Sequence, residues 1–325
     1  MRKLLPFILV TAFALVSCAS SSWVSNPYAS YSRDRYIAAV GYGDSADTAD
    51  INAKAEMASL FGLRVTSVTA RTVTETLSSY DESFMRANAA YADVDNLYGV
   101  EIVKRTVDKD GRHVSLCVME KKPTLEYLEG NIGSERNGVE RLYGLVDGTL
   151  GTLEGLGNAH DLVSAVSDCN THIAMINYLS GGNEEYLDEK TASDKWKEAR
   201  ESVTVAVTVT GDDTGAVEGV ISSLLTGCGI RVAETADEAS SAALCSVNMR
   251  EVQGNGIASK FVFAEYDAVL SLIDSTSGKT VLTYSYSGKE GHQSYQSAVT
   301  RAVKDLSEDI TSSFGEEMKE KFGNS

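Results

Sequence analysis

The residue with the most distinctive chemical setting is a cysteine close to the start of the chain. Cys18 follows two apolar residues and a small one, Leu15-Val16-Ser17. Arg2 and Lys3 give the start of the chain a positive charge, and Leu4–Val16 is an apolar stretch too short to span a bilayer as a helix. A thiol in this setting is a group to which lipid can be attached. The small residues beside it let a processing peptidase approach the backbone.

This pattern is the lipobox of bacterial lipoproteins, in which the cysteine sulfur receives a diacylglycerol and the chain is cut just before it. The sequence therefore predicts a signal peptide over 1–17 and a lipidated tether over 18–22, with Cys18 as the lipidation site. The alternative is an ordinary secretory peptide or an uncleaved anchor. Acyl chains hold a protein on a membrane through about 0.8 kcal/mol for each buried methylene. The four residues after Cys18 reach at most roughly 14 Å, so we expect the folded body to lie close to the bilayer.

Composition narrows the classes of function. The 325 residues carry a formal net charge of −17, which a nucleic-acid backbone would repel. Four histidines leave little imidazole for acid–base catalysis. An acidic surface favours solubility, and its alternative role is attraction to a basic partner protein. Ala19 stands where many lipoproteins of the inner membrane have aspartate, which favours the outer membrane as the location.

The remaining cysteines and histidines suggest no defined metal or disulfide site. An exported chain can form disulfides, but these spacings select no pairing. We expect buried free thiols, with a Cys228–Cys245 bond as the alternative. Cys169 and His172 share one helix face, and His160 adds a third ligand only if helices fold back, so metal binding is not expected. The four cysteines after Cys18 are Cys117, Cys169, Cys228 and Cys245.

Two glycine-containing segments imitate nucleotide-binding motifs. Gly41-x-Gly43-x-x-Ala46 lies between a predicted strand and a predicted helix, which is the setting of a dinucleotide-binding turn. Asp44 places negative charge where a phosphate would lie, so we expect close strand–helix packing instead. Gly278-Lys279-Thr280 matches the end of a P-loop, but Ile273 occupies the position of its first glycine, and a hairpin turn is expected.

The elements form three blocks. The pattern of residues 23–122 predicts a strand, a helix, a strand and a hairpin. Residues 123–198 have the pattern of a helical hairpin or linker. The pattern of residues 199–325 predicts a second sheet with helices on one side. The fold class is therefore α+β, with a β-α-β-hairpin domain and a β-α-β-β-β-β-α domain separated by a helical segment. Finer expectations are a helix from Ala46 to Leu60, strands over 36–40, 63–75, 100–107 and 112–119, a helix break at 155–158 and a charged link over 183–199.

The third block has a similarly readable pattern. Valines alternate over 203–209, an apolar helix follows at 217–225, and a hairpin is expected from two alternating stretches around Ser275–Gly278. Apolar residues at helical spacing between 295 and 314 predict the last helix. The shorter strands are expected over 230–233 and around 245–249, and the hairpin strands over 261–274 and 279–287.

The first block combines the lipobox, Trp23, Asn26-Pro27, Tyr36–Gly43, an alanine-spaced helix, and Gly99–Val103 before the Asp110-Gly111 turn. In these features it resembles the LPP20 family of bacterial lipoproteins. The resemblance implies an envelope lipoprotein with a helix packed on a small antiparallel sheet, relatives associated with flagella or envelope assembly, and no catalytic residue. The element order of the third block is similar to domains of the curli-secretion and penicillin-binding-protein-activator class, although topology alone does not define function.

These observations predict a lipid-anchored, non-catalytic protein of the cell envelope. We expect a structural or assembly adaptor that acts through protein–protein contacts and needs no cofactor. One alternative is a periplasmic regulator that docks on a peptidoglycan synthase, and a second is an enzyme of unrecognised type. The expected partners are the membrane, through acyl chains on Cys18, other envelope proteins, and in a further hypothesis a second copy of the chain. Tyr28, Tyr31, Tyr36 and Trp23 lie near the tether, where we expect them to pack on the first block, with lipid headgroups as the alternative contact.

Overall fold

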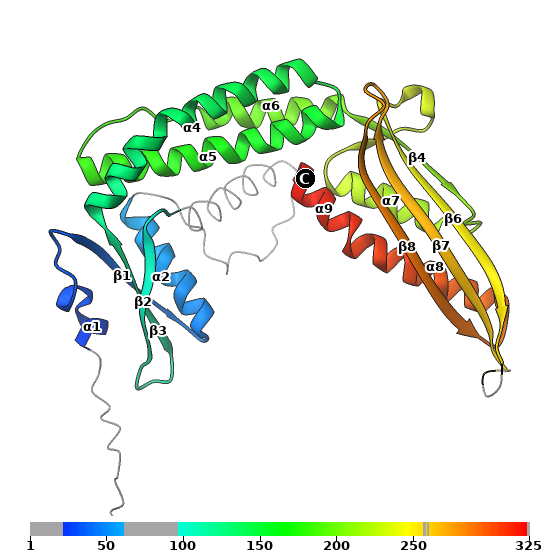
Figure 1. Cartoon of the computed structure of the whole chain (residues 1–325), viewed down its shortest axis with the longest axis horizontal. Helices are drawn as coiled ribbons and strands as arrows, with labels where there is room; N and C mark the ends of the chain where they lie inside the picture. Colours follow the sequence, from blue (N-terminus) through cyan, green and yellow to red (C-terminus); the bar gives the residue numbers. More distant parts are fainter. Residues whose placement is uncertain (1–21, 62–96, 256–257, 259, 324–325) are drawn as a thin grey trace, which may run out of the picture.

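The structure is a computed structural model that describes residues 22–61, 97–255, 258 and 260–323. The signal peptide, the Cys18 lipidation site and the strand predicted over 63–75 lie outside these residues. The described part is an arch in which two sheet-containing units lie at opposite ends of a layer of long helices (Figure 1). The α+β fold class is confirmed.

The N-terminal unit, residues 22–61 and 97–120, is built on a small antiparallel sheet. Its described strands are β1 (Tyr36–Gly43), β2 (Val100–Val107) and β3 (His113–Glu120), in the order β1-β3-β2. Helix α2 (Ala46–Leu60) packs on one face, while the short α1 (Ser22–Ser25) and η1 (Pro27–Ala29) belong to the other. The predicted hairpin is confirmed, with Gly111 at a φ of +81° in its turn.

The alanine-rich stripe of α2 is largely as predicted. Ser45 caps the helix by accepting a hydrogen bond from the Thr48 backbone N–H, and Ala53 and Met57 are buried in the core. Leu60, the last residue of the helix, is 37% exposed, and Phe61 directly after it is buried in the core.

The helical segment differs from the prediction in two places. It consists of α4 (Lys121–Thr149), α5 (Leu153–Ser180) and α6 (Glu189–Ser202). The charged link expected over 183–199 is therefore limited to 183–188, and the rest of it is helix. Most residues of α6 are charged, and most of these lie on its solvent side, so the sequence gives little sign that Trp196 is buried. The break expected at 155–158 also lies earlier, because the Thr152 hydroxyl accepts a hydrogen bond from the Gly155 backbone N–H and starts α5 there.

The long helices contribute to both hydrophobic cores. Leu128 of α4 and Met175 of α5 are buried with Met119 in the core of the N-terminal unit. At their other end, Val146 and Leu156 join the core that contains the second sheet. The helical layer is therefore packed structure that connects the two units.

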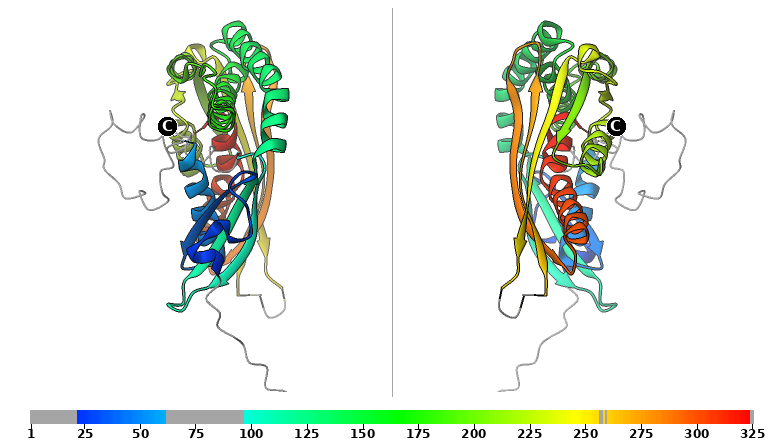
Figure 2. Two further views of the ribbon diagram at one scale, coloured as in Figure 1. Left: turned by 90° about the vertical axis from the view of Figure 1, so that its left-hand side faces the viewer. Right: turned by 90° about the vertical axis from the view of Figure 1, so that its right-hand side faces the viewer.

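The C-terminal unit, residues 203–323, has a mixed sheet in the order β5-β4-β6-β7-β8. Strand β4 runs parallel to β5 and β6, and β6, β7 and β8 form an antiparallel meander. Helices α7 and α8 cover one face, as predicted (Figure 2). A further helix, α9, follows α8. The elements are β4 (Thr204–Thr210), α7 (Ala216–Gly227), β5 (Arg231–Val232), η3 (Ala236–Glu238), β6 (Ser241–Gln253), β7 (Val262–Asp274), β8 (Thr280–His292), α8 (Tyr295–Ser312) and α9 (Phe314–Phe322).

Candidate functional site

The first described residues fasten the chain to the N-terminal unit. Trp23 of α1 is 7% exposed and packs with Leu116 and Val118 on the face of the sheet away from α2. Tyr28 is partly buried there, and its hydroxyl accepts a hydrogen bond of 3.3 Å from the Ala38 backbone N–H. The predicted packing of these aromatic residues on the first block is therefore confirmed for Trp23 and Tyr28.

The glycines of the Gly41-x-Gly43 motif serve strand–helix packing. A Cβ atom on Gly41 would lie 2.0 Å from the backbone nitrogen of Ala53 and 2.4 Å from the carbonyl oxygen of Ala49. A Cβ atom on Gly43 would lie 2.6 Å from the Ala49 nitrogen. The close approach of α2 to β1 leaves no room for a side chain at either position, so the expectation of close packing is confirmed.

All four described cysteines are buried free thiols, so the Cys228–Cys245 alternative is wrong. Burial raises the pKa of Cys117 to about 12 and the pKa values of Cys169 and Cys228 to about 11, because it penalises the charged thiolate. These thiols are consequently poor nucleophiles and poor metal ligands in the folded protein.

The histidine candidates do not converge on a metal site. The Nδ1 atom of His172 lies 2.8 Å from a carboxylate oxygen of Glu135 on α4. His160 instead faces Trp196, with the ring centroids 6.0 Å apart, and burial lowers its pKa. No group of three or more His, Cys, Asp or Glu residues suitable for a metal ion occurs among the described residues.

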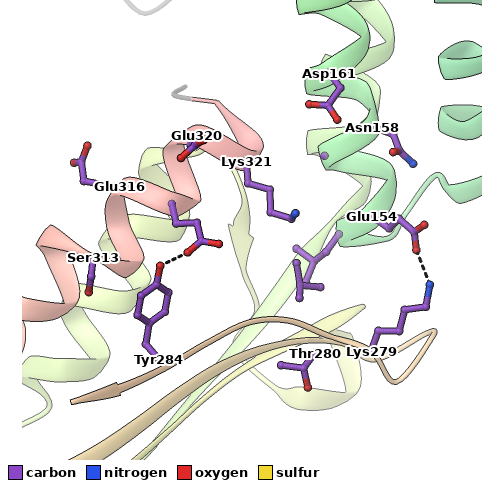
Figure 3. Close-up of a pocket in the computed structure, with 14 residues that line it drawn as sticks. Glu154, Asn158, Asp161, Lys279, Thr280, Tyr284, Ser313, Glu316, Glu320 and Lys321 are labelled. Atoms are coloured by element: carbon purple, nitrogen blue, oxygen red, sulfur yellow. Dashed lines mark hydrogen bonds and ion pairs between the residues drawn. The ribbon is translucent and has the colours of Figure 1, made fainter. Parts of the chain in front are cut away.

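A groove lies between the start of α5, the start of β8 and α9 (Figure 3). We call it the acidic groove. Its volume is about 740 Å³, and side chains from the three elements face it. Five carboxylates and two ammonium groups line it, so its net charge is negative: Glu154, Asp161, Glu316, Glu317 and Glu320, with Lys279 and Lys321.

Buried Asp274 fixes one wall of the acidic groove. Its carboxylate accepts hydrogen bonds from the Leu153 backbone N–H, at 2.9 Å, and from the Ser277 backbone N–H, at 2.8 Å. It therefore caps the first turn of α5 and closes the β7–β8 turn with one group. Gly278 in that turn has a φ of +69°, which confirms the hairpin expected from the Gly-Lys-Thr segment.

The charged side chains of the groove are partly paired. The Lys279 ammonium lies 3.1 Å from Glu154, and the Tyr284 hydroxyl donates a hydrogen bond to Glu317. That hydrogen bond, together with burial, raises the pKa of Tyr284 to about 12. The surplus of carboxylates suits a ligand that brings cations or hydrogen-bond donors. Sequence reasoning missed this site because its residues come from three distant segments, and only the acidic residues near the C-terminus signal it.

Strand β8 lies at the edge of its sheet in the part of the chain that the structure describes. Thr280, Val281 and Tyr284 of this strand line the acidic groove. An edge strand presents backbone donors and acceptors to a partner. The groove therefore offers both negative charge and a strand edge.

No protein-family model matches the chain, and a search of curated proteins finds no match. Among solved structures, the chain is similar to a minor lipoprotein from Acinetobacter baumannii, at 13% identity and a TM-score of 0.26, over 35% of this chain and 93% of that one. It is similar to the secreted protein HP1454 from Helicobacter pylori, at 14% identity and a TM-score of 0.33, over 85% of this chain and 96% of that one. It is also similar to lipoprotein GNA1162 from Neisseria meningitidis, at 16% identity and a TM-score of 0.23, over 34% of this chain and 99% of that one. At these scores the likenesses establish neither a family nor a function.

Among the described residues, no helix combines the length and the apolar character needed to cross a membrane.

Proposed function

We propose that this chain is a lipid-anchored protein of the bacterial cell envelope that acts without catalysis, as a structural or assembly adaptor. The observation that carries the proposal is the lipobox Leu15-Val16-Ser17-Cys18 behind a short apolar leader. The outer membrane, favoured by Ala19, and membership of the LPP20 family, favoured by the first block, belong to the same proposal.

The anchoring of the first described residues supports this function. Trp23 is buried against the N-terminal unit only five positions after Cys18. A tether of that length spans less than roughly 20 Å when fully extended. Acyl chains on Cys18 therefore hold the folded body beside the bilayer, where it meets other envelope components.

The acidic groove is the surface where we expect the protein contact. Its net negative charge and the strand edge of β8 suit an extended, basic segment of a partner protein, which would pair with the strand and place cations against the carboxylates. A regulator of a peptidoglycan synthase is the second candidate function, and it would use the same surface.

Membrane partition tests the anchor. We expect Cys18→Ala to fold normally, with an unchanged circular dichroism spectrum, and to leave the detergent-rich phase and the membrane fraction. The matched control Ser17→Ala keeps a small residue before the cysteine and should remain in the membrane. A Cys18→Ala protein that stays membrane-bound would contradict the proposal.

Photo-crosslinking in cells tests the partner. A crosslinking amino acid at Thr280 reports on the acidic groove, and one at Ser246, exposed on the uncovered face of the sheet, is the control. Assembly components captured from position 280 alone would support the adaptor, and a peptidoglycan synthase would support the regulator. Equal capture from both positions would contradict the role of the groove.

A further inference from the structure

We propose that one side of the N-terminal unit is a second membrane contact, which binds the anionic headgroups of phospholipids. This inference rests on the proposed lipid anchor. The surface, which we call the tether face, is the side of the three-stranded sheet that carries α1 and η1. Its cations are Arg33, Lys104 and Lys121, and its aromatic residues include Tyr28 and Tyr31.

The tether face lies next to the lipid anchor in the sequence. Trp23 packs on the same face as Tyr28 and Tyr31, and Cys18 lies only five residues before it. Acyl chains at Cys18 therefore bring this side of the unit within reach of the headgroups. In Figure 1, α1 lies on the outer side of the N-terminal unit, away from the C-terminal unit.

The cations of the tether face are held in place but not neutralised. The Arg33 guanidinium lies 4.1 Å from the centre of the Tyr28 ring. The Lys104 ammonium donates to the Ser30 hydroxyl at 3.2 Å and lies 5.8 Å from the centre of the Tyr31 ring. Aromatic faces attract cations without cancelling their charge.

The third cation of the tether face is held by the backbone. The Lys121 ammonium donates to the Arg33 carbonyl oxygen at 2.7 Å. Within the described ranges, neither this ammonium nor the Arg33 and Lys104 cations form an ion pair with a carboxylate. By contrast, Arg35 is paired with Glu120 at 2.7 Å, and Arg105 with Asp50 at 2.5 Å. Arg33, on the loop after η1, and the neighbouring Lys104 and Lys121 thus keep their positive charge.

Negative charge is distributed unevenly along the chain. Residues 123–325 carry a formal net charge of −17, whereas residues 18–122 carry only −2. An anionic membrane surface repels the helical layer and the C-terminal unit, and it attracts the tether face. Together these forces orient the molecule with the acidic groove away from the bilayer. Tyrosines are also common at the level of the headgroups.

Fluorescence quenching in vesicles tests this orientation. The mature lipoprotein carries an environment-sensitive dye on Ala29→Cys, an exposed position of η1, or on Ser223→Cys, an exposed position of α7. The native described cysteines are buried and do not compete for the dye. Vesicles contain brominated phosphatidylcholine alone or mixed with phosphatidylglycerol.

We expect brominated lipid to quench the dye at position 29 and not at position 223, and only when phosphatidylglycerol is present. Salt at about 1 M, where the Debye length is near 3 Å, should remove the quenching. Replacing the three cations with glutamine (Arg33→Gln, Lys104→Gln and Lys121→Gln together) should reduce surface occupancy by roughly fivefold for each charge. The fivefold factor corresponds to about 1 kcal/mol for each cation close to an anionic membrane surface.

A charge-matched control separates the tether face from total charge. The triple variant Arg141→Gln, Lys197→Gln and Lys304→Gln loses the same charge from exposed positions of α4, α6 and α8, and it should keep the quenching. Equal quenching in neutral and anionic vesicles, or equal losses in the two triple variants, would overturn the inference. Flotation with vesicles distinguishes the two proposals. Protein that floats but shows no quenching at position 29 contradicts only the membrane contact of the tether face. Protein that does not float contradicts the lipid anchor at Cys18.

Discussion

The replacement of Gly41 by alanine is expected to destabilise the N-terminal unit strongly. The added Cβ atom would lie 2.0 Å from the Ala53 backbone nitrogen and 2.4 Å from the Ala49 carbonyl oxygen, both of which belong to the helix backbone. Non-bonded heavy atoms pack at about 3.5–4.0 Å, so α2 has to move away by roughly 1.5 Å. A gap of about 1 Å already removes up to half of a contact's attraction. We therefore expect a loss of about 3 kcal/mol in the free energy of unfolding, the upper end of the overpacking range.

Gly144→Ala is the control of opposite sign. Gly144 is an exposed residue inside α4, and a Cβ atom there meets nothing within 4 Å. Because glycine costs a helix interior about 0.5–1 kcal/mol relative to alanine, this substitution is expected to stabilise the protein by that amount. The same change of residue thus has opposite consequences at the two positions.

Urea unfolding followed by tryptophan fluorescence measures both effects. Trp23 belongs to the N-terminal unit and Trp196 to the core of the C-terminal unit, so single-tryptophan variants report each core separately. The Gly41→Ala midpoint should fall most in the Trp23 signal. A Gly41→Ala protein within about 0.5 kcal/mol of the parent, or a Gly144→Ala protein destabilised equally, would refute the packing argument.

Three further outcomes follow from individual contacts. Asp274→Ala removes the acceptor for the Leu153 N–H and should lower stability by about 2–4 kcal/mol in urea unfolding, with a smaller loss for Asp274→Asn. Hydrogen bonds from Arg105 hold the pKa of Asp50 below its ordinary value of 3.8. The ionised Asp50 carboxylate therefore contributes fully to the free energy of unfolding above that pH, and this contribution is lost as the pH falls below it. Asp50→Asn should flatten the dependence of stability on pH in this acidic range, and an unchanged dependence would contradict this. The four buried thiols should react with iodoacetamide only in urea, since burial raises their pKa values; rapid labelling of the native protein would contradict their burial.

The sequence allowed the elements of both units to be predicted because each carries a strong local signal. Alternation of valine marks β4, and an Asp-Gly turn joins β2 to β3. Gly41 shows a different kind of signal, because close strand–helix contact leaves no room for a side chain. These features depend on near neighbours in the sequence.

The helical layer and the acidic groove could not be predicted in the same way. Helix α6 has one strongly buried aromatic residue, Trp196, among many charged side chains, so its composition resembles a solvated link. Thr152 starts α5 through a single hydroxyl contact, which overrides the glycines that follow. The groove depends on Asp274 joining a hairpin to a helix more than a hundred residues away in the sequence, and no local pattern reveals such a contact.

Mass spectrometry of the mature N-terminus tests the central claim most directly. The protein purified from its natural membrane is digested, and the peptide that begins at Cys18 is identified. We predict a chain that starts at this residue, with a diacylglycerol joined to the sulfur through a thioether. An intact leader before residue 18, or a free thiol at that position, would contradict it.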